Sequence, residues 1–171
     1  MNKVYITDKE IKRAAVSLAE NIENDKYKPD LIVAVTRGGL IPAGYISYYL
    51  DQPNVDVVKL QTYEGENQVG AGEEQEYQLR VDLQNIIKKW NPKNILFIDD
   101  LIDTGNTLKL IDVNLTAVYN YFKMIGVKRD FDWAFGVLYS VPDVEKRFMK
   151  KIYRGAIKPE GWLVFPWDTR D

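Results

Sequence analysis

Short apolar runs alternate with segments of helical spacing along most of this 171-residue chain, and this alternation constrains the fold more than any other feature. The runs are rich in Val and Ile, which favours buried strands, whereas the intervening segments repeat apolar residues every three or four positions. The expected strands are 31–35, 55–60, 95–98, 133–139 and 152–157, and the expected helices are 11–22, 41–50, 81–90 and 108–125. Strands that alternate with helices predict an α/β fold with a doubly wound, mostly parallel sheet.

Length and composition favour one domain, 1–171, with a core of its own, because 46% of the residues are hydrophobic and no linker or internal repeat interrupts the pattern. No apolar run is long enough to cross a bilayer, and residues 1–5 lack the pattern of a secretory signal, so we expect a cytoplasmic protein. The 23 basic and 25 acidic residues are interspersed. We therefore expect a small-molecule partner, no nucleic acid and no membrane surface.

The chain contains neither histidine nor cysteine. Disulfides, thiolate nucleophiles and zinc sites built on cysteine are thereby excluded, and an acid–base catalyst must be a carboxylate, a lysine or a tyrosine. A bound metal must be a hard ion held by oxygen, which makes Mg²⁺ the expected cofactor.

Three acidic residues crowd the end of the apolar run 95–98. Asp99 and Asp100 are adjacent, and Asp103 follows after two apolar residues. Their mutual repulsion becomes tolerable if a cation or a ligand rich in hydroxyl groups occupies the site. Small side chains, hydroxyls and backbone N–H groups then open a helix, which suits a phosphate monoester; they belong to Thr104, Gly105, Asn106 and Thr107. Together these features describe a pocket for a phosphorylated sugar.

The segment 95–107 resembles the phosphoribosyl pyrophosphate signature of type I phosphoribosyltransferases. Paired acids after a strand also occur in receiver domains, but there the pair follows the first strand. The resemblance implies the type I phosphoribosyltransferase fold, with Asp99 and Asp100 on the ribose hydroxyls and Asp100 also near Mg²⁺. It further implies that residues 104–107 hold the 5-phosphate. Asp103 corresponds to the carboxylate near purine N7, which accepts or relays a proton.

Two loops extend the resemblance. Arg37, Gly38 and Gly39 follow the strand 31–35 and are similar to the family's pyrophosphate loop, although an ordinary tight turn has the same sequence character. The polar, Glu- and Gly-rich segment 62–78, with Thr62, Tyr63 and Gln68, takes the place of the flexible catalytic hood. A solvated loop without function would read the same way.

The tail resembles the end of bacterial xanthine-guanine phosphoribosyltransferases, which carry a Trp followed, after three residues, by Pro-Trp-Asp. Trp162 and Asp168 match that spacing. The resemblance implies a small C-terminal base-binding segment in which Trp162 stacks on the purine and Asp168 lies near its two-position substituent. The alternative is that Trp162 and Trp167 pack in the core or in an oligomer contact.

The family's lysine for the purine six-oxo group has no counterpart in the stretch 137–142. Ser140 or Tyr139 could donate instead, or Lys146 or Lys158 could reach the base along a different backbone path. This departure leaves the preferred base open.

The resemblance implies a Mg²⁺-dependent transferase of purine salvage, which moves ribose 5-phosphate from phosphoribosyl pyrophosphate to guanine, xanthine or hypoxanthine and acts as a homo-oligomer, a dimer or a tetramer. Two alternatives stay open. One is a regulatory protein that binds phosphoribosyl pyrophosphate without transfer, although Asp103 and the tail exceed what a sensor requires. The other is a phosphoribosyltransferase for a different base.

Overall fold

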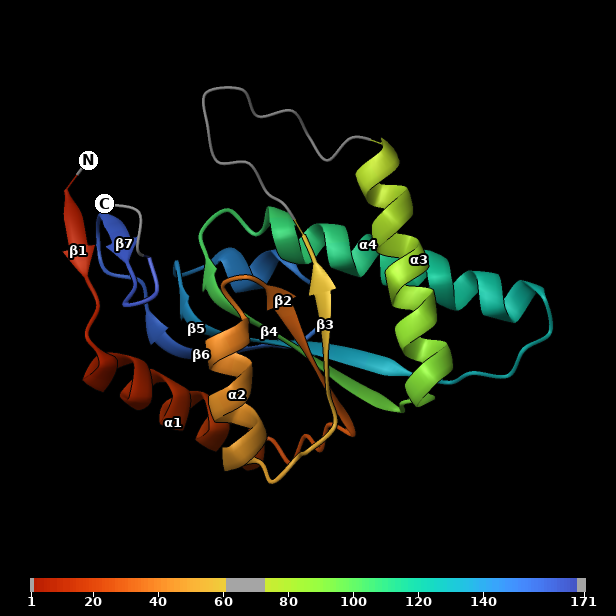
Figure 1. The fold of residues 1–171 in the computed structure, drawn as a ribbon, viewed down its shortest axis with the longest axis horizontal. Coiled ribbons are helices and arrows are strands. Elements are labelled where there is room, and N and C mark those ends of the chain that lie inside the picture. The colour runs from red at the N-terminus through yellow and green to blue at the C-terminus, as the bar shows by residue number, and fades with distance from the viewer. Residues whose placement is uncertain (1, 61–72, 169–171) are drawn as a thin grey trace.

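The computed structural model describes residues 2–60 and 73–168, and its ribbon is drawn in Figure 1. Strands and helices alternate through most of the chain, as the sequence predicts. In chain order the elements are β1 (Lys3–Tyr5), α1 (Asp8–Asn24), β2 (Leu31–Thr36), α2 (Leu40–Tyr49), β3 (Val55–Lys59), α3 (Glu73–Trp90), β4 (Asn94–Ile102), α4 (Asn106–Met124), β5 (Asp132–Ser140), the 3₁₀ turn η1 (Val144–Arg147), β6 (Ile152–Ile157) and β7 (Trp162–Val164).

Five strands form one sheet in the order β3-β2-β4-β5-β6, and every neighbouring pair in it is parallel. The predicted doubly wound α/β architecture is thereby confirmed. β1 and β7 form a separate two-stranded parallel sheet beside it (Figure 1). The sequence analysis did not predict these two short strands, because three residues are too few to display a period.

Helices cover both faces of the five-stranded sheet (Figure 1). α1 and α2 pack on one face, where Leu18, Ile46 and Ile98 belong to one buried apolar cluster. α3 and α4 pack on the other, where Leu83, Leu115 and other apolar residues form a second cluster. Alternate residues of the central strands serve opposite clusters, which is why these strands read as continuous apolar runs. None of the helices in residues 2–60 and 73–168 combines the length and the apolar character that a membrane span requires.

The prediction of a loop over 62–78 is wrong at its end, because α3 begins at Glu73. Residues 73–78 are mostly Glu and Gln, which are good helix formers, and they extend a helix that Leu79, Leu83 and Ile87 anchor in the core. The remainder of the predicted hood, with Thr62, Tyr63 and Gln68, lies outside the described residues.

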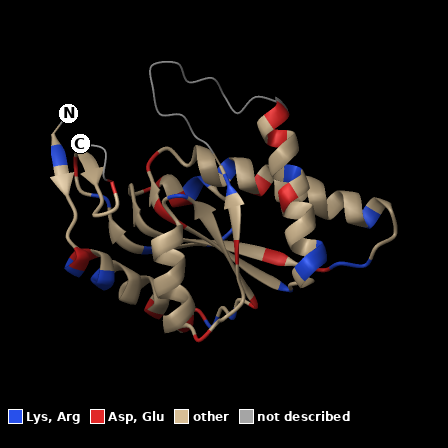
Figure 2. Cartoon of the chain, viewed as in Figure 1, with Lys and Arg blue, Asp and Glu red and all other residues tan. Residues whose placement is uncertain are grey.

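α2 differs from the other helices in having no charged residue, which Figure 2 shows as a helix in a single neutral colour. Its inner face buries Pro42, Ala43 and Ile46. Its outer face remains apolar, and Tyr48 is 90% exposed there. Helices that are apolar on all sides are normally buried on all sides, so this outer face is unusual for a monomer.

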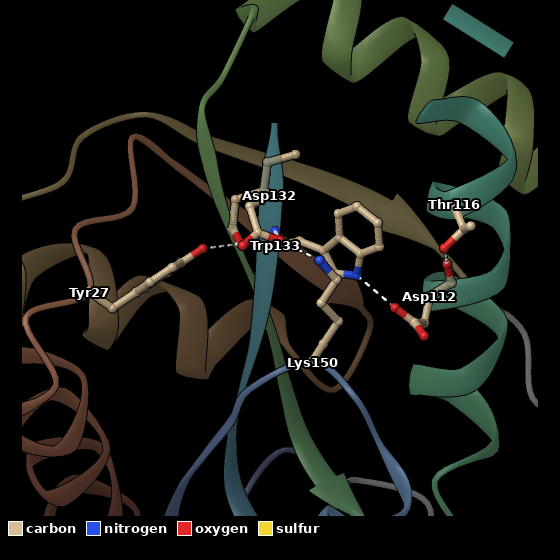
Figure 3. A network of polar contacts seen from close by, with 7 residues as sticks. Tyr27, Asp112, Thr116, Asp132, Trp133 and Lys150 are labelled. Carbon is tan, nitrogen blue, oxygen red and sulfur yellow. Dashed lines mark hydrogen bonds and ion pairs between the residues drawn. The ribbon is translucent and has the colours of Figure 1, made fainter. Parts of the chain in front are cut away.

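A polar network ties α4 to the amino-terminal end of β5 (Figure 3). The indole Nε1 of Trp133 donates to Asp112 Oδ1 at 2.8 Å, and the Lys150 ammonium lies 3.8 Å from the centroid of the indole ring while pairing with Asp132. This network lies at the amino end of β5, whereas the acidic segment lies at the carboxyl end of β4, so the network holds the scaffold rather than a ligand.

Candidate active site at the carboxyl end of the sheet

β2 and β4 separate at their carboxyl ends, and the region beyond this point, with residues 36–39 and 99–105, is called the crevice. Their pairing ends at Ala34 and Ile98, whereas β4 continues beside β5 as far as Ile102 and Ser140. β2 turns away into the Arg37 loop, so the last residues of β4 have a strand partner on one side only. The strand order also reverses between β2 and β4. Ligands of open α/β sheets bind at such switch points, beyond the carboxyl ends of the strands.

Asp99 and Asp100 occupy this crevice from within the strand, since β4 extends further than the predicted 95–98. Asp99 is 9% exposed, and its Oδ1 accepts the backbone N–H of Asp100 at 2.9 Å. Burial, followed by the negative charge of Asp100, holds the pKa of Asp99 well above its ordinary value. Burial also raises the pKa of Asp100 to about 6. Two carboxylates held this close favour a site that receives positive charge or hydroxyl donors.

The Arg37 loop lies against Asp100. A Cβ added to Gly38 would stand 2.5 Å from Asp100 Cγ and 2.6 Å from its Oδ1, so no larger residue fits without displacement. Gly39 is equally confined, because its Cβ would meet the carbonyl oxygen of Val35 at 2.7 Å. The Arg37 side chain is exposed at the crevice edge, and the peptide bond between Thr36 and Arg37 is cis. The loop thus brings its backbone against the carboxylate of Asp100.

The segment after Asp103 turns sharply into α4. Gly105 is the N-cap of the helix, with φ +84, and a Cβ there would meet Phe148 and Val144 at 3.1 Å. Glycine is required by both the backbone conformation and the space. No side chain caps Gly105, although Thr104 Oγ1 accepts the Asn106 N–H at 3.4 Å. The helix therefore presents N–H groups that lack intrahelical partners, next to the hydroxyls of Thr104 and Thr107.

Lys158 reaches the same region from beyond β6. Its side chain is only 13% exposed, and its ammonium donates to the carbonyl oxygen of Gly161 at 2.8 Å and lies 3.9 Å from Asp103 Oδ1. Its backbone N–H donates to Ser140 O at 2.8 Å, which fixes the start of this segment at the end of β5. The half-exposed carboxylate of Asp103 and the Lys158 ammonium thus lie close together beyond the carboxyl end of β4.

The other three candidate donors have different surroundings. Ser140 is fully buried, and its hydroxyl donates to Glu145 at 2.6 Å. Tyr139 is 5% exposed, and its ring packs against Phe165 in the core on the α1 side. Lys146 pairs with Asp143 at 2.5 Å and has an 80% exposed side chain. Of the four residues, Lys158 alone directs its charge toward Asp103.

The tail places Trp162 and Trp167 in different environments. Trp162 is 47% exposed, whereas Trp167 stacks on Phe165 with ring centroids 4.9 Å apart and an interplanar angle of 3°. The Trp167 Nε1 is buried without a hydrogen-bond partner of good geometry among the described residues, yet the indole lies near enough to Asp100 to oppose the rise in its pKa. Asp168 Oδ2 accepts the Phe165 N–H at 2.8 Å and closes a turn.

Comparison with known proteins identifies the scaffold. The model of the phosphoribosyl transferase domain matches residues 5–119, which include the Arg37 loop and the whole acidic segment. The chain belongs to the phosphoribosyltransferase family. Lys158 and the tail lie beyond the matched residues.

Named relatives of this phosphoribosyltransferase act on purines. The xanthine-guanine phosphoribosyltransferase of Chromohalobacter salexigens is 31% identical over 137 residues, which cover 80% of this chain and 67% of that protein. The enzyme of the same name from Idiomarina loihiensis is 28% identical over 96% of this chain and 86% of its own length. The solved structure of a purine phosphoribosyltransferase from Pyrococcus horikoshii has a TM-score of 0.61 and 26% identity, covering 98% of this chain and 95% of that one.

The described residues of this phosphoribosyltransferase offer a metal ion fewer than three acidic side chains in one place. Among the described residues, no group of three acidic side chains is arranged to bind an ion, so Asp99, Asp100 and Asp103 do not converge as a set. Mg²⁺ commonly keeps its waters and binds through one or two carboxylates plus the oxygens of a phosphate substrate. The acidic pair Asp99 and Asp100 near the carboxyl end of β4 fits binding of Mg²⁺ through one or two carboxylates.

In this phosphoribosyltransferase the structure brings some of the residues named from the sequence close together, and it adds one residue that the sequence did not single out. The structure brings Gly38 into contact with Asp100, and Asp103 near Lys158. The sequence prediction assigned no role to Gly161, whose φ is +121 and whose contact with Asn2 ties the tail to the segment that leads into β1. An isolated glycine after Lys158-Pro159-Glu160 was the only available signal.

Proposed function

We propose that this phosphoribosyltransferase transfers ribose 5-phosphate from phosphoribosyl pyrophosphate to the ring nitrogen of a 6-oxopurine and releases pyrophosphate. One observation carries the proposal: the glycine backbone of the Arg37 loop touches the carboxylate of Asp100. A pyrophosphate site and a ribose site that meet in this way bracket the anomeric carbon between them. The purine-specific names of the relatives support the choice of acceptor.

The sugar half of the substrate binds to the family's signature segment. Asp99 and Asp100 accept hydrogen bonds from the ribose hydroxyls, and the backbone of 104–107 with its threonine hydroxyls holds the 5-phosphate at the N-terminus of α4. Arg37 and the amides of Gly38 and Gly39 bind the pyrophosphate. The burial that raises the pKa of both carboxyls is consistent with groups that receive donors or a cation from the substrate complex.

Mg²⁺ is the proposed cofactor, with Asp100 as its protein ligand. When bound, it would neutralise charge on the pyrophosphate oxygens. The protein's own share of that task falls to Arg37 and the loop amides, which are placed to stabilise the leaving group electrostatically.

The base half is formed by Lys158, Trp162 and Asp168. The largely buried Lys158 ammonium has three donors, of which the Gly161 carbonyl occupies one, so it can donate to the six-oxo oxygen of a purine. Ser140 and Tyr139 lack free access, since one hydroxyl is committed to Glu145 and the other side chain is buried in the core. The half-exposed Trp162 offers an aromatic face for stacking. Asp168 lies near the opposite edge of the base.

In the reaction the bond between the anomeric carbon and pyrophosphate oxygen breaks while a bond to the purine nitrogen forms. The electron pair leaves with pyrophosphate, and the purine loses one proton. Asp103 is the proposed acceptor of that proton, and its half-exposed carboxylate can pass it on to water. Lys158, 3.9 Å away, stabilises negative charge both on Asp103 and on the base oxygen.

A homo-oligomer is proposed as well, with the outer face of α2 and the adjacent exposed residues Val55 and Val57 of β3 as its interface. The α2 part of this face is uncharged and carries Tyr48, Tyr49, Leu40 and Ile41 at exposures between 43% and 90%. A second copy of the chain is the partner that such a neutral, apolar face fits, since it needs no complementary charge. α2 follows Gly39 directly, so the same contact would steady the Arg37 loop.

A panel of bases tests the function. Pyrophosphate release from phosphoribosyl pyrophosphate is measured with guanine, xanthine, hypoxanthine, adenine, uracil and orotate, each with Mg²⁺ and with EDTA. We expect turnover with at least one 6-oxopurine, little with the other bases, and none in EDTA. Binding of phosphoribosyl pyrophosphate without turnover on any base would instead indicate a regulatory protein, and turnover in EDTA would exclude the metal.

A further inference from the structure

The small sheet formed by β1 and β7 brings residues 3–5 beside residues 162–164 (Figure 1). Lys3, Val4 and Tyr5 pair in parallel with Trp162, Leu163 and Val164. Beyond these pairs, Trp162 N–H donates to Asn2 O at 2.8 Å and Ile6 N–H donates to Val164 O at 2.9 Å. The segment that carries Trp162 is therefore bound to residues 2–6 along its whole length.

Packing makes this pairing stable. An isolated pair of short strands is at best marginal in water. Here Ile6, Leu163 and Val164 are each 7% exposed or less, and Ile6 and Leu163 belong to the same apolar cluster as α1. α1 begins directly after β1 with a capping box, in which Thr7 and Glu10 exchange hydrogen bonds. β1 is thus held by its pairing with β7 and by α1, which begins directly after it, and β7 is held in place through β1.

Gly161 is the joint between this sheet and Lys158. Its carbonyl oxygen accepts the Lys158 ammonium at 2.8 Å, while its α-carbon lies so close to β1 that an added Cβ would stand 2.6 Å from Asn2 O. Its φ of +121 is a conformation that residues with side chains rarely adopt. The position of the Lys158 acceptor is therefore set by the contact between Gly161 and Asn2.

We propose that residues 2–6 act as a clamp that positions Lys158 and Trp162, and that this clamp sets the affinity for the base without contacting it. The proposal rests on the function proposed above, because it takes the region of Lys158 and Trp162 as the base site. The clamp residues are positioning residues. The ribose and phosphate segments belong to β4 and α4, whose placement depends on the five-stranded sheet and not on β1.

The test compares two positive-φ glycines. Gly161→Ala strains the joint, whereas Gly126→Ala introduces the same substitution at φ +73, after α4, where a Cβ would meet nothing within 4 Å. We expect Gly161→Ala to raise the KM for the 6-oxopurine roughly 10- to 100-fold, the effect of losing a well-placed charged hydrogen bond. The KM for phosphoribosyl pyrophosphate should stay within about twofold. Gly126→Ala should leave both KM values unchanged.

A chain that lacks residues 2–5 provides the second variant. We expect the same split between the two KM values and faster amide hydrogen exchange in 158–164, with unchanged exchange in β4 and β5. A folded Gly161→Ala protein with an unchanged KM for the base, or unchanged exchange in 158–164 after truncation, would overturn the clamp. Absence of transfer by the wild-type protein would contradict the proposed function instead, and the exchange measurement decides the clamp in that case.

Discussion

The α-carbon of Gly38 lies against the carboxylate of Asp100, so that the turn after β2 and the acidic end of β4 share one wall of the crevice. Neither segment could shift without moving the other. The φ of Gly38 is not in the left-handed region, so glycine is needed at this position for space alone. Substitutions at Gly38 therefore report on the contact between the two segments rather than on backbone strain.

Gly38→Ala should weaken the binding of phosphoribosyl pyrophosphate, because the new methyl group must displace either the loop or the Asp100 carboxylate. Overpacking of this kind costs ~1 to 3 kcal/mol, which corresponds to a roughly 5- to 150-fold rise in the KM for that substrate. Steady-state kinetics with saturating base measures it. An unchanged KM in a folded Gly38→Ala protein would separate the loop from the substrate site.

Asp103→Asn should lower turnover by ~10²- to 10⁴-fold and leave the binding of phosphoribosyl pyrophosphate largely intact, since a general base acts on the transition state. Single-turnover kinetics separates the chemical step from product release. Turnover near that of the wild-type protein would remove Asp103 from catalysis.

Lys158→Met should reduce kcat/KM for 6-oxopurines by roughly 10- to 150-fold, because a charged hydrogen bond to a ligand contributes ~1.5 to 3 kcal/mol. Lys146→Met is the matched control, since Lys146 pairs with Asp143 in solvent and should be neutral. Lys158→Arg should recover part of the activity. Equal effects of the Lys158 and Lys146 variants would exclude a donor role for Lys158.

Trp162→Ala should weaken base binding by roughly 5- to 150-fold, as the loss of ~1 to 3 kcal/mol of stacking predicts. Trp133→Phe is the control, because it removes a hydrogen bond to Asp112 far from the crevice and should lower the melting temperature alone. Asp168→Asn should alter the preference among guanine, xanthine and hypoxanthine, which differ at the two-position. Parallel losses of stability and of activity on every base would mean that Trp162 only packs.

Tyr48→Asp should convert the proposed oligomer into monomers, since a carboxylate would be buried against an uncharged face. Light scattering coupled to size-exclusion chromatography measures the mass. Tyr77→Asp offers a control at a tyrosine of α3 that is 67% exposed. A wild-type protein that is already monomeric, or an oligomer that survives Tyr48→Asp, would contradict the assignment of the α2 face.

The local sequence pattern was enough to predict the five-stranded sheet and its helices, because each strand is a distinct apolar run and each helix repeats apolar residues over several turns. It could not predict that β4 runs on through Asp99 to Ile102, since polar residues after an apolar run read as a loop. They remain in the strand because β5 supplies pairing as far as Ser140. The start of α3 was not predicted either, because its first residues have helical propensity but no apolar period.

The candidate site divides in the same way. Asp99, Asp100 and residues 104–107 are contiguous, so a short signature predicts them together. Lys158 and Gly161 become part of the site only through the fold, because the first lies 55 positions after Asp103 and the second depends on a contact with Asn2. Sequence separation of that size leaves several lysines equally plausible. In the structure Lys146 pairs with Asp143, and the Ser140 hydroxyl donates to Glu145. Of the candidate donors, Lys158 is the one that lies near Asp103.

The hydrogen bond between Trp133 and Asp112 limits where α4 can move. It fixes α4 to β5 some six residues after the helix begins, so the body of the helix keeps its position along the sheet. Displacement is left to the few residues between Asp103 and Asn106, with Gly105 as their pivot. Any movement at the start of α4 is therefore confined to this short turn, while the rest of the helix stays in place.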